Sequence, residues 1–366
     1  MKRLTLGDVC KKASSNIAQK DLQDKIGAYP IYGASGLIKQ VDFYQQDKEY
    51  IAVVKDGAGI GRTMLLPAYS SVIGTMQYLL PKEGIPIDIK YLFYAVEHMN
   101  LAKYFSGATI PHIYFKDYQK EPINIPDIDT QRKISRIFDK IDALIISRKE
   151  QRTRLDQIVK SRFIEMFGDV IRNSKAWQMR VFEDVAASRL GKMLDAKQQT
   201  GKYSYPYLAN FNVQWFRFNI ENLNQMDFDE DDRAEFELKD GDLLVCEGGE
   251  IGRCAVWHNE IQPCFFQKAL HRVRCNRQII HPDYLAWWFK YNCDYDGFTA
   301  IAGSKATIAH LPGIKLKQLQ VAVPPIELQE QFATFVEQTD KSKLAIQKSL
   351  EKLEILKKAL MQKYFG

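Results

Sequence analysis

The sequence predicts a mixed α/β (α+β) fold in which two globular domains are joined by two long helices, with an internal pseudo-twofold repeat. The first observation is a phrase that occurs twice, as SGATIPH from Ser106 and as SKATIAH from Ser304. Several residues recur at one offset of 198 positions: Thr109 and Thr307, Ile110 and Ile308, His112 and His310, Gln131 and Gln329, Phe167-Gly168 and Phe365-Gly366. An offset held over roughly sixty residues predicts a duplicated structural unit.

The second observation is a pair of long segments, residues 129–168 and 326–366, that each carry one apolar stripe. In the first segment, apolar residues recur every three or four positions, as at Ile134, Phe138 and Ile141, which is typical of an amphipathic helix. A proline precedes each segment and a glycine ends it, as at many helix termini. Because a long one-sided helix needs a partner, we expect the two helices to pair as an antiparallel coiled coil. The alternative is that each helix packs on its own preceding domain.

The third observation is the character of residues 1–128 and 169–325, which are predicted to form the two globular domains. Short strands joined by glycine turns are indicated by EYIAVVKDGAGIG and GDLLVCEGGEIGRCAVW. Helices are indicated at matching places by IKYLFYAVEHMNLAKYF and PDYLAWWFKYNCDY. The offset between matching residues grows from 176 at Val9 and Val185 to 198 at Thr109 and Thr307. The second domain has therefore gained about 22 residues, and such insertions usually lie in loops.

Length and composition set further bounds. The 366 residues exceed what one hydrophobic core usually serves, so at least two domains are expected. The start of the chain lacks the apolar stretch of a signal peptide, and no apolar run is long enough to span a bilayer. We therefore expect a cytoplasmic protein. The six cysteines form no C-x-x-C pair, which favours reduced thiols over a zinc site. A net charge of +6 excludes a uniformly basic DNA-coating protein but allows local basic surfaces.

Motifs of common catalytic sites are missing from the sequence. It contains no phosphate-binding P-loop, no G-x-S-x-G turn and no metal-type carboxylate cluster. The string GAGIG is better interpreted as a glycine turn than as a dinucleotide site, and the acidic run 227–242 lacks the spacing of a calcium loop. The repeated His112 and His310 could suggest a catalytic pair, but their place in a repeated turn favours a structural hydrogen bond. We expect no catalytic residues, no metal and no cofactor.

Loops with alternating polar, basic and aromatic residues are the candidates for a binding surface. Amides and cations suit the edges of bases in the major groove, and hydroxyl groups suit phosphates. The alternative for each residue is an ordinary exposed loop side chain. The candidate DNA-binding residues are Lys39, Thr75, Gln77, Ser106, Thr109, Lys192, Asn212, Gln214, Arg217, Gln267, Lys268, Ser304, Lys305 and Thr307.

These phrases, in this order and twice over, resemble the DNA-specificity subunits of type I restriction–modification enzymes. The resemblance covers essentially the whole chain and rests on YPIYGASGLIKQVDFY, VVKDGAGIGR, LKDGDLLVCEGGEIGRCAV, the two ATI-x-H phrases, IPDIDTQRKISRIFDKIDALI and VPPIELQEQFATFVEQTDKSK. It implies that residues 1–128 and 169–325 are target-recognition domains, each reading one half of a bipartite, asymmetric site in double-stranded DNA. The helices would then set the spacer between the half-sites and dock two methyltransferase subunits.

The same resemblance assigns the chemistry to partners. Methylation from S-adenosylmethionine and ATP-driven cleavage would belong to methyltransferase and restriction (translocase) subunits, which agrees with the missing catalytic motifs. The chain begins at MKRLTLGDV with no helical stretch before the first domain, which favours a compact two-repeat subunit over a fusion to a methyltransferase. Two other hypotheses stay open: an enzyme (a nuclease or part of a self-contained methyltransferase) and a coiled-coil protein scaffold unrelated to DNA.

Overall fold

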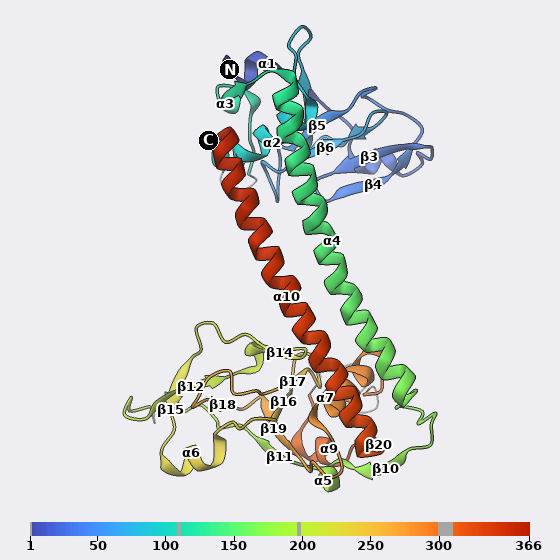
Figure 1. Ribbon diagram of the computed structural model, residues 1–366, viewed down its shortest axis with the longest axis vertical. Coiled ribbons are helices and arrows are strands. Elements are labelled where there is room, and N and C mark those ends of the chain that lie inside the picture. Colours follow the sequence, from blue (N-terminus) through green and yellow to red (C-terminus); the bar gives the residue numbers. More distant parts are fainter. Residues whose placement is uncertain (1, 108–110, 196–198, 299–309) are drawn as a thin grey trace. The chain divides into compact units, whose positions relative to one another are not determined.

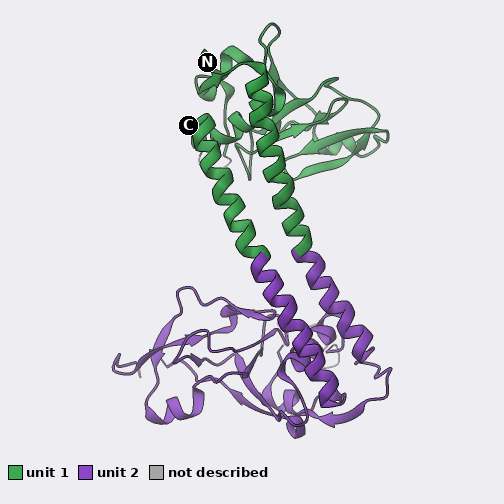
Figure 2. Ribbon diagram, in the orientation of Figure 1, with its two compact units in different colours: residues 1–151, 346–366 green, residues 152–345 purple. Residues whose placement is uncertain are grey.

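The computed structural model describes residues 2–107, 111–195, 199–298 and 310–366 (Figure 1). The chain divides into two compact units, which are shown in different colours in Figure 2. Unit 1 comprises residues 1–151 and 346–366, and unit 2 comprises residues 152–345. The division passes through both long helices, so each unit contains one part of each helix.

Unit 1 contains two main sheets and a terminal strand pair. The four-stranded antiparallel sheet has the order β2 (Cys10–Ser14), β8 (Met76–Pro81), β5 (Tyr50–Val54) and β6 (Thr63–Leu66). The smaller sheet has the order β4 (Gly36–Val41), β3 (Tyr29–Gly33) and β7 (Ser71–Val72), with β3 and β7 parallel. An antiparallel pair joins β1 (Lys2–Thr5) and β9 (Pro122–Ile125).

The core of unit 1 lies on both faces of β5. Ile51 and Val53 pack with helix α2 (Ile89–His98), whereas Tyr50, Ala52 and Val54 pack toward the smaller sheet. Because side chains alternate across a strand, a central strand buried on both faces must be apolar throughout, as YIAVV is. The remaining short helices are α1 (Leu6–Val9), η1 (Gln19–Leu22), η2 (Leu101–Tyr104) and α3 (Phe115–Tyr118).

Unit 2 repeats this arrangement strand by strand. Its four-stranded antiparallel sheet has the order β11 (Ala186–Leu190), β19 (Leu270–Cys275), β16 (Leu243–Cys246) and β17 (Cys254–Val256). The smaller sheet has the order β15 (Gln225–Asp227), β12 (Ser204–Leu208) and β18 (Phe265–Phe266), again with one parallel pair. The terminal pair is β10 (Gln178–Val181) with β20 (Gln320–Val323). The duplication seen in the sequence is therefore a duplication of the fold.

Helices of unit 2 also have counterparts in unit 1. Helix α7 (Pro282–Asp294) packs its apolar side on the four-stranded sheet, as α2 does in unit 1. The short helices are α5 (Phe182–Val185), η4 (Asn210–Asn212), α6 (Glu230–Phe236) and α9 (Gly313–Lys317). Two elements account for much of the extra length of unit 2: a hairpin of β13 (Val213–Gln214) and β14 (Arg217–Phe218) between β12 and β15, and α6 between β15 and β16.

The long helices are α4 (Ile128–Phe167) and α10 (Ile326–Phe365), each with 40 residues. Within unit 1 they run antiparallel, since Phe138 contacts the Phe365 ring and Asp142 pairs with Lys357 at 2.9 Å. Within unit 2 they are antiparallel as well, since Asp156 pairs with Lys343 at 2.7 Å and Phe163 contacts Phe332. The expected antiparallel pairing is confirmed.

Each long helix also packs on the globular domain that precedes it in the sequence. The two packing modes considered from the sequence therefore occur together. In unit 1, Ile134 and Phe138 of α4 join the core around α2. In unit 2, Phe332 and Val336 of α10 join the core around α7.

The repeated glutamines, Gln131 and Gln329, hold the start of each long helix. Both side chains are fully buried. The Gln131 amide accepts from the Asp88 backbone N–H at 2.8 Å and donates to the carbonyls of Pro86 and Pro126. Gln329 makes the same three bonds, with the His281 N–H and with the carbonyls of Ile279 and Pro324. In unit 1, one glutamine side chain thus connects a loop with the starts of α2 and α4. In unit 2, its counterpart connects a loop with the starts of α7 and α10.

Substituting Gln131→Ala should lower the free energy of unfolding of unit 1 by about 3 kcal/mol, because three buried backbone groups lose their partner. Gln329→Ala should do the same to unit 2. Denaturant titration of each variant measures the loss, with Gln338→Ala as the matched control because Gln338 is exposed on α10. A loss no greater than that of the control would contradict the role of these buried amides.

Candidate nucleic-acid interface

In unit 1, turns from distant parts of the sequence meet at one edge of the sheets. The N–H groups of Lys55 and Asp56 donate to the Thr75 carbonyl at 3.0 and 3.2 Å, and the Gly57 N–H donates to the Pro111 carbonyl at 3.0 Å. The Arg62 guanidinium donates to the Ala34 carbonyl at 2.9 Å. We refer to the joined segments as loop cluster 1, which comprises residues 15–17, 33–36, 55–62, 73–75, 106–107 and 111–112.

Unit 2 assembles the same turns with similar bonds. The Glu247 N–H donates to the Ala269 carbonyl at 2.9 Å, and the Leu311 N–H donates to the Glu247 carbonyl at 2.6 Å. The Arg253 guanidinium donates to the Asn210 carbonyl at 3.1 Å, as Arg62 does to its own loop. The joined segments form loop cluster 2, which comprises residues 190–193, 209–219, 247–253, 267–269 and 310–311.

Glycines allow the tight turn between β5 and β6 and its counterpart between β16 and β17. Gly61 has a φ of +77°, and a Cβ there would lie 2.3 Å from the Ala102 backbone nitrogen. Gly252, its counterpart in unit 2, has a φ of +76°. Only glycine adopts such a conformation without strain, and the chain continues into strands β6 and β17. The interpretation of GAGIG as a turn is confirmed.

The predicted site residues separate into four groups. Seven lie in the two loop clusters: Thr75, Ser106, Lys192, Gln214, Arg217, Gln267 and Lys268. Two are buried, Gln77 and Asn212, which are 3% and 1% exposed. One, Lys39, lies on β4, outside loop cluster 1. Four fall outside the described residues: Thr109, Ser304, Lys305 and Thr307.

The two buried amides make internal hydrogen bonds. Gln77 donates to the Tyr118 hydroxyl. Asn212 accepts from the Ala209 N–H at 2.9 Å and donates to the Asn219 carbonyl at 2.9 Å. Because these bonds occupy both side chains inside the fold, we leave Gln77 and Asn212 out of the proposed interface.

Two of the predicted lysines are held by neighbouring groups. The Lys39 ammonium donates to the Leu22 carbonyl at 2.8 Å. The Lys192 ammonium donates to the Asp227 carbonyl at 2.7 Å and pairs with Asp232. Lys192 therefore joins the turn after β11 to the start of α6, and its charge is largely neutralised.

The cations with the greatest freedom are Arg217 and Lys268 in loop cluster 2. Both are exposed, and within the described ranges neither side chain has an ion-pair or hydrogen-bond partner. Gln267 is half-buried and its side-chain amide is likewise unpaired in the described structure. A guanidinium, an ammonium and an amide at neighbouring turns are groups that can bind phosphates and base edges.

Loop cluster 1 gains positive charge from two residues that sequence reasoning missed, Lys12 and Lys55. Burial and the nearby Lys12 cation lower the pKa of Lys55. Lys55 lies 3.8 Å from Asp56, while Lys12, an exposed residue of edge strand β2, has no ion-pair partner in the described part of the chain. Strand alternation would place Lys12 on the face of buried Cys10, so the sequence carried no signal for Lys12, and the position of Lys55 depends on the folded turn.

His112 makes the structural contact that its repeated position predicted. Its Nδ1 hydrogen-bonds the Asp56 carboxylate, and its ring lies against Tyr114, with the centroids 4.1 Å apart. Burial and the Lys55 cation lower the pKa of His112. His310 occupies the same place in unit 2, where Gly248 stands in place of Asp56. The two loop clusters therefore differ in chemistry at equivalent positions.

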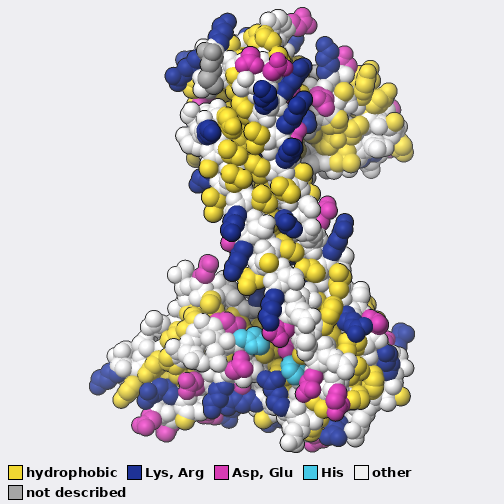
Figure 3. Space-filling view, viewed as in Figure 1, with side chains coloured by type: hydrophobic (Ala, Val, Ile, Leu, Met, Phe, Trp, Pro, Cys, Tyr) yellow, Lys and Arg dark blue, Asp and Glu magenta, His cyan; other side chains and the backbone are white. Residues whose placement is uncertain are grey.

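The distribution of charged residues is compatible with local binding surfaces but not with a uniformly basic protein surface. In each unit, Figure 3 shows Lys and Arg interspersed with Asp and Glu on the visible face. No helix in the described residues combines the length and apolar character needed to cross a membrane. Among the same residues, no group of three or more His, Cys, Asp or Glu side chains could hold a metal ion.

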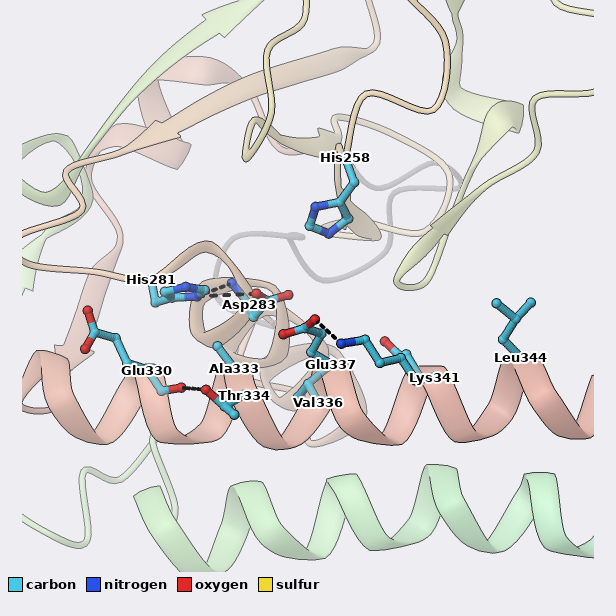
Figure 4. Close-up of a pocket in the computed structure, with 11 residues that line it drawn as sticks. His258, His281, Asp283, Glu330, Ala333, Thr334, Val336, Glu337, Lys341 and Leu344 are labelled. Carbon is cyan, nitrogen blue, oxygen red and sulfur yellow. Dashed lines mark hydrogen bonds and ion pairs between the residues drawn. The ribbon is translucent and has the colours of Figure 1, made fainter.

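Unit 2 contains a cavity of about 670 Å³ whose polar residues stabilise the start of a helix. It lies between α10 and the start of α7, where His281 and Asp283 face each other and Glu337 pairs with Lys341 (Figure 4). Burial lowers the pKa of His281 to about 4 and raises that of Asp283 to about 6. The His281 ring accepts from the Asp283 N–H at 3.3 Å and so caps α7. These groups therefore serve the helix start.

A duplicated α/β fold, with an equivalent loop cluster in each copy and a long helix after it, defines a class of internally repeated proteins. Residues 1–157 and 174–357 match the family described as the type I restriction modification DNA specificity domain. The chain belongs to this family, as its sequence motifs indicated.

Similar proteins extend the match over the whole chain. The putative type I restriction enzyme specificity subunit S.HindORF215P of Haemophilus influenzae is 21% identical over 366 residues, which cover 94% of this chain and 92% of the relative. The putative type I restriction enzyme MjaX specificity subunit of Methanocaldococcus jannaschii is 26% identical over 193 residues. That match spans 52% of this chain and only 45% of the relative's length.

Solved structures share the fold. The crystal structure of the type I restriction–modification S subunit from M. genitalium gives a TM-score of 0.61 at 17% identity, and the match covers 100% of this chain and 96% of that one. A chain from a study of complex assembly and conformational transition in the type I system gives 0.60 at 13% identity, covering 100% and 97%. Both agree with the mixed α/β fold predicted from the sequence.

Proposed function

We propose that this chain is the DNA-reading subunit of a type I restriction–modification complex. Loop cluster 1 reads one half of a bipartite site in double-stranded DNA, and loop cluster 2 reads the other half. The observation that carries the proposal is the pair of equivalent loop clusters with different side chains, in a chain of the specificity family. Because the two clusters differ, the site is asymmetric.

The long helices have two roles in this proposal: they set the spacing between the half-sites, and they dock methyltransferase subunits. Support for docking comes from large apolar side chains that α4 and α10 leave exposed, which are Leu144, Ile146, Ile158, Ile164, Leu344, Ile355 and Leu356. Exposed large apolar side chains can contribute to a protein-binding site. Methylation and ATP-driven cleavage belong to the methyltransferase and restriction subunits, and this chain is non-catalytic.

A selection from random-sequence DNA tests the proposal, using this chain co-purified with its methyltransferase subunits. The expected result is a motif of two different parts separated by a fixed gap. A stable complex that enriches no motif would favour a protein scaffold, whose DNA affinity should show no dependence on salt. Turnover of S-adenosylmethionine or DNA by the chain alone would instead identify it as an enzyme.

Single lysine substitutions should affect one half-site each. Lys55→Ala should weaken binding to the half-site of loop cluster 1 and reduce the slope of log affinity against log salt by about 0.9, the value for one lost phosphate contact. Lys268→Ala should do so for the other half-site. Titration of DNA carrying one half-site at several salt concentrations measures both effects, and Lys48→Ala, at an exposed position outside loop cluster 1, is the control. Equal losses at both half-sites would contradict independent reading.

A further inference from the structure

Unit 2 carries an inserted segment that unit 1 lacks. In unit 1, β3 and β4 are joined by the two residues Ala34 and Ser35. At the same place in unit 2, residues 209–224 separate β12 from β15 and contain the β13–β14 hairpin. The first part of this insertion belongs to loop cluster 2, because Asn210 donates to the Gly248 carbonyl at 3.0 Å and accepts from Arg253.

The hairpin is anchored by three aromatic residues around its turn. The Phe216 ring stacks on Trp287 of α7, with centroids 4.4 Å apart and an interplanar angle of 17°. Phe218 contacts Trp257 at 5.2 Å, edge to face. The Trp215 indole N–H donates to Glu250 at 2.6 Å, and Lys290 lies 4.8 Å from the centre of the Trp215 ring. Contacts to several elements hold the backbone in one position.

The opposite side of the hairpin carries Gln214 and the exposed Arg217. Val213 pairs with Phe218 across the hairpin, and Gln214 pairs with Arg217. Because side chains of directly opposite residues lie on the same face, Gln214 and Arg217 share the face away from buried Val213. The Gln214 amide donates to the Phe211 carbonyl at 3.2 Å, which places the Phe211 segment beside that face.

The exposed residues have a chemistry that suits DNA bases. Phe211 is 59% exposed, although an aromatic ring of this size is usually buried. Arg217 is exposed and has no partner among the described residues. A guanidinium forms two parallel hydrogen bonds with the O6 and N7 atoms of guanine, and an aromatic ring makes apolar contact with the methyl group of thymine. A rigid backbone keeps such groups in place before binding.

We propose that Phe211 and Arg217 determine specificity at base pairs that only unit 2 reads, with Arg217 binding guanine and Phe211 contacting thymine. The half-site of loop cluster 2 is then longer than that of loop cluster 1. This inference rests on the proposed function, since it assigns residues to one of the two proposed half-sites.

The test is the DNA selection described above, repeated with the complex carrying Arg217→Ala, Arg217→Lys or Phe211→Ala. Each variant should lose preference at one position of the unit 2 half-site by about 10- to 100-fold, the value of one good base contact. The other half-site and the gap should not change. Arg217→Lys retains the charge but not the two-pronged geometry, so it should lose base preference while retaining affinity.

Arg172→Ala is the matched control, because Arg172 is an exposed arginine of unit 2 outside loop cluster 2. A uniform loss of affinity over all sequences, restored by Arg217→Lys, would show a phosphate contact and overturn base reading by Arg217. An unchanged unit 2 motif in all three variants would overturn the inference and leave the proposed function intact. Absence of a two-part motif with the unsubstituted chain would overturn the proposed function itself.

Discussion

Lengthening both long helices by seven residues, after Gln151 in α4 and after Ala345 in α10, should increase the gap between the two selected half-sites by about three base pairs. Seven helical residues add roughly 10 Å, and each base pair of DNA rises about 3.4 Å. Affinity for the original site should fall on the order of 100-fold, because only one half-site can then be bound specifically. DNA selection and titration with the methyltransferase complex measure both effects.

The register of the helix pair explains why seven residues are chosen and why both helices must be changed. The ion pairs of Asp142 with Lys357 and of Asp156 with Lys343 are 14 residues apart on each helix. This separation is two heptads, and a heptad insertion preserves the apolar seam of paired helices. An insertion in α4 alone would displace one partner of a pair and should destabilise the protein.

The control for this prediction is an insertion of the same length in an exposed turn outside the long helices. Gly84 lies in an exposed turn with a φ of +80° and open space around it, so seven residues placed before it should leave both half-sites and their gap unchanged. If the doubly lengthened protein folds and selects the original gap, the helices do not set the spacing.

Much of the fold was predictable because its signals are local. The apolar runs of YIAVV and LLVC indicated the buried strands β5 and β16, and the helical periods indicated α2, α4 and α10. The constant offset of Gln131 and Gln329 revealed the repeat. It could not reveal their role, since the three bonds of each glutamine reach backbone groups up to 50 residues away in the sequence.

The candidate interface was harder to predict because exposure is decided by tertiary packing. Gln77 and Asn212 have amide side chains of the kind found in DNA-binding loops. The fold nevertheless buries both, and their hydrogen bonds are made within the protein. Lys192 is paired with Asp232, which is 40 residues away in the sequence. Phe211 lies in an aromatic-rich loop segment, and only the fold shows that Val213 is buried and that Phe216 and Phe218 are partly buried, whereas Phe211 is exposed.

The offset between matching residues of the two repeats grows along the chain, and this growth partly indicated how the two domains differ. It indicated that the second domain is longer, but not where the additional residues lie. The structure places them in the β13–β14 hairpin and in α6, and only the hairpin brings unpaired side chains to loop cluster 2. An insertion at a binding edge changes what is recognised, whereas an insertion elsewhere on the surface changes little.

Phe163→Ala should lower the free energy of unfolding of unit 2 by about 3–5 kcal/mol, the usual cost of removing a fully buried phenylalanine ring. Phe163 is 1% exposed and lies where α4, α7 and α10 meet. Its ring contacts Phe332 of α10 with centroids 5.5 Å apart, and it stacks on Tyr284 of α7 at 5.8 Å. The substitution therefore leaves a cavity between three helices, which cannot all close on it.

Thermal and denaturant unfolding of the variant measure this loss. Ile164→Ala is the control, because Ile164 is the next residue of α4 and is 37% exposed, so its loss should be smaller by at least about 2 kcal/mol. Since Phe163 joins the long helices to unit 2, its loss should also weaken binding to the unit 2 half-site more than to the other. If the two variants are equally stable, the aromatic cluster around Phe163 does not hold the long helices on the rest of unit 2.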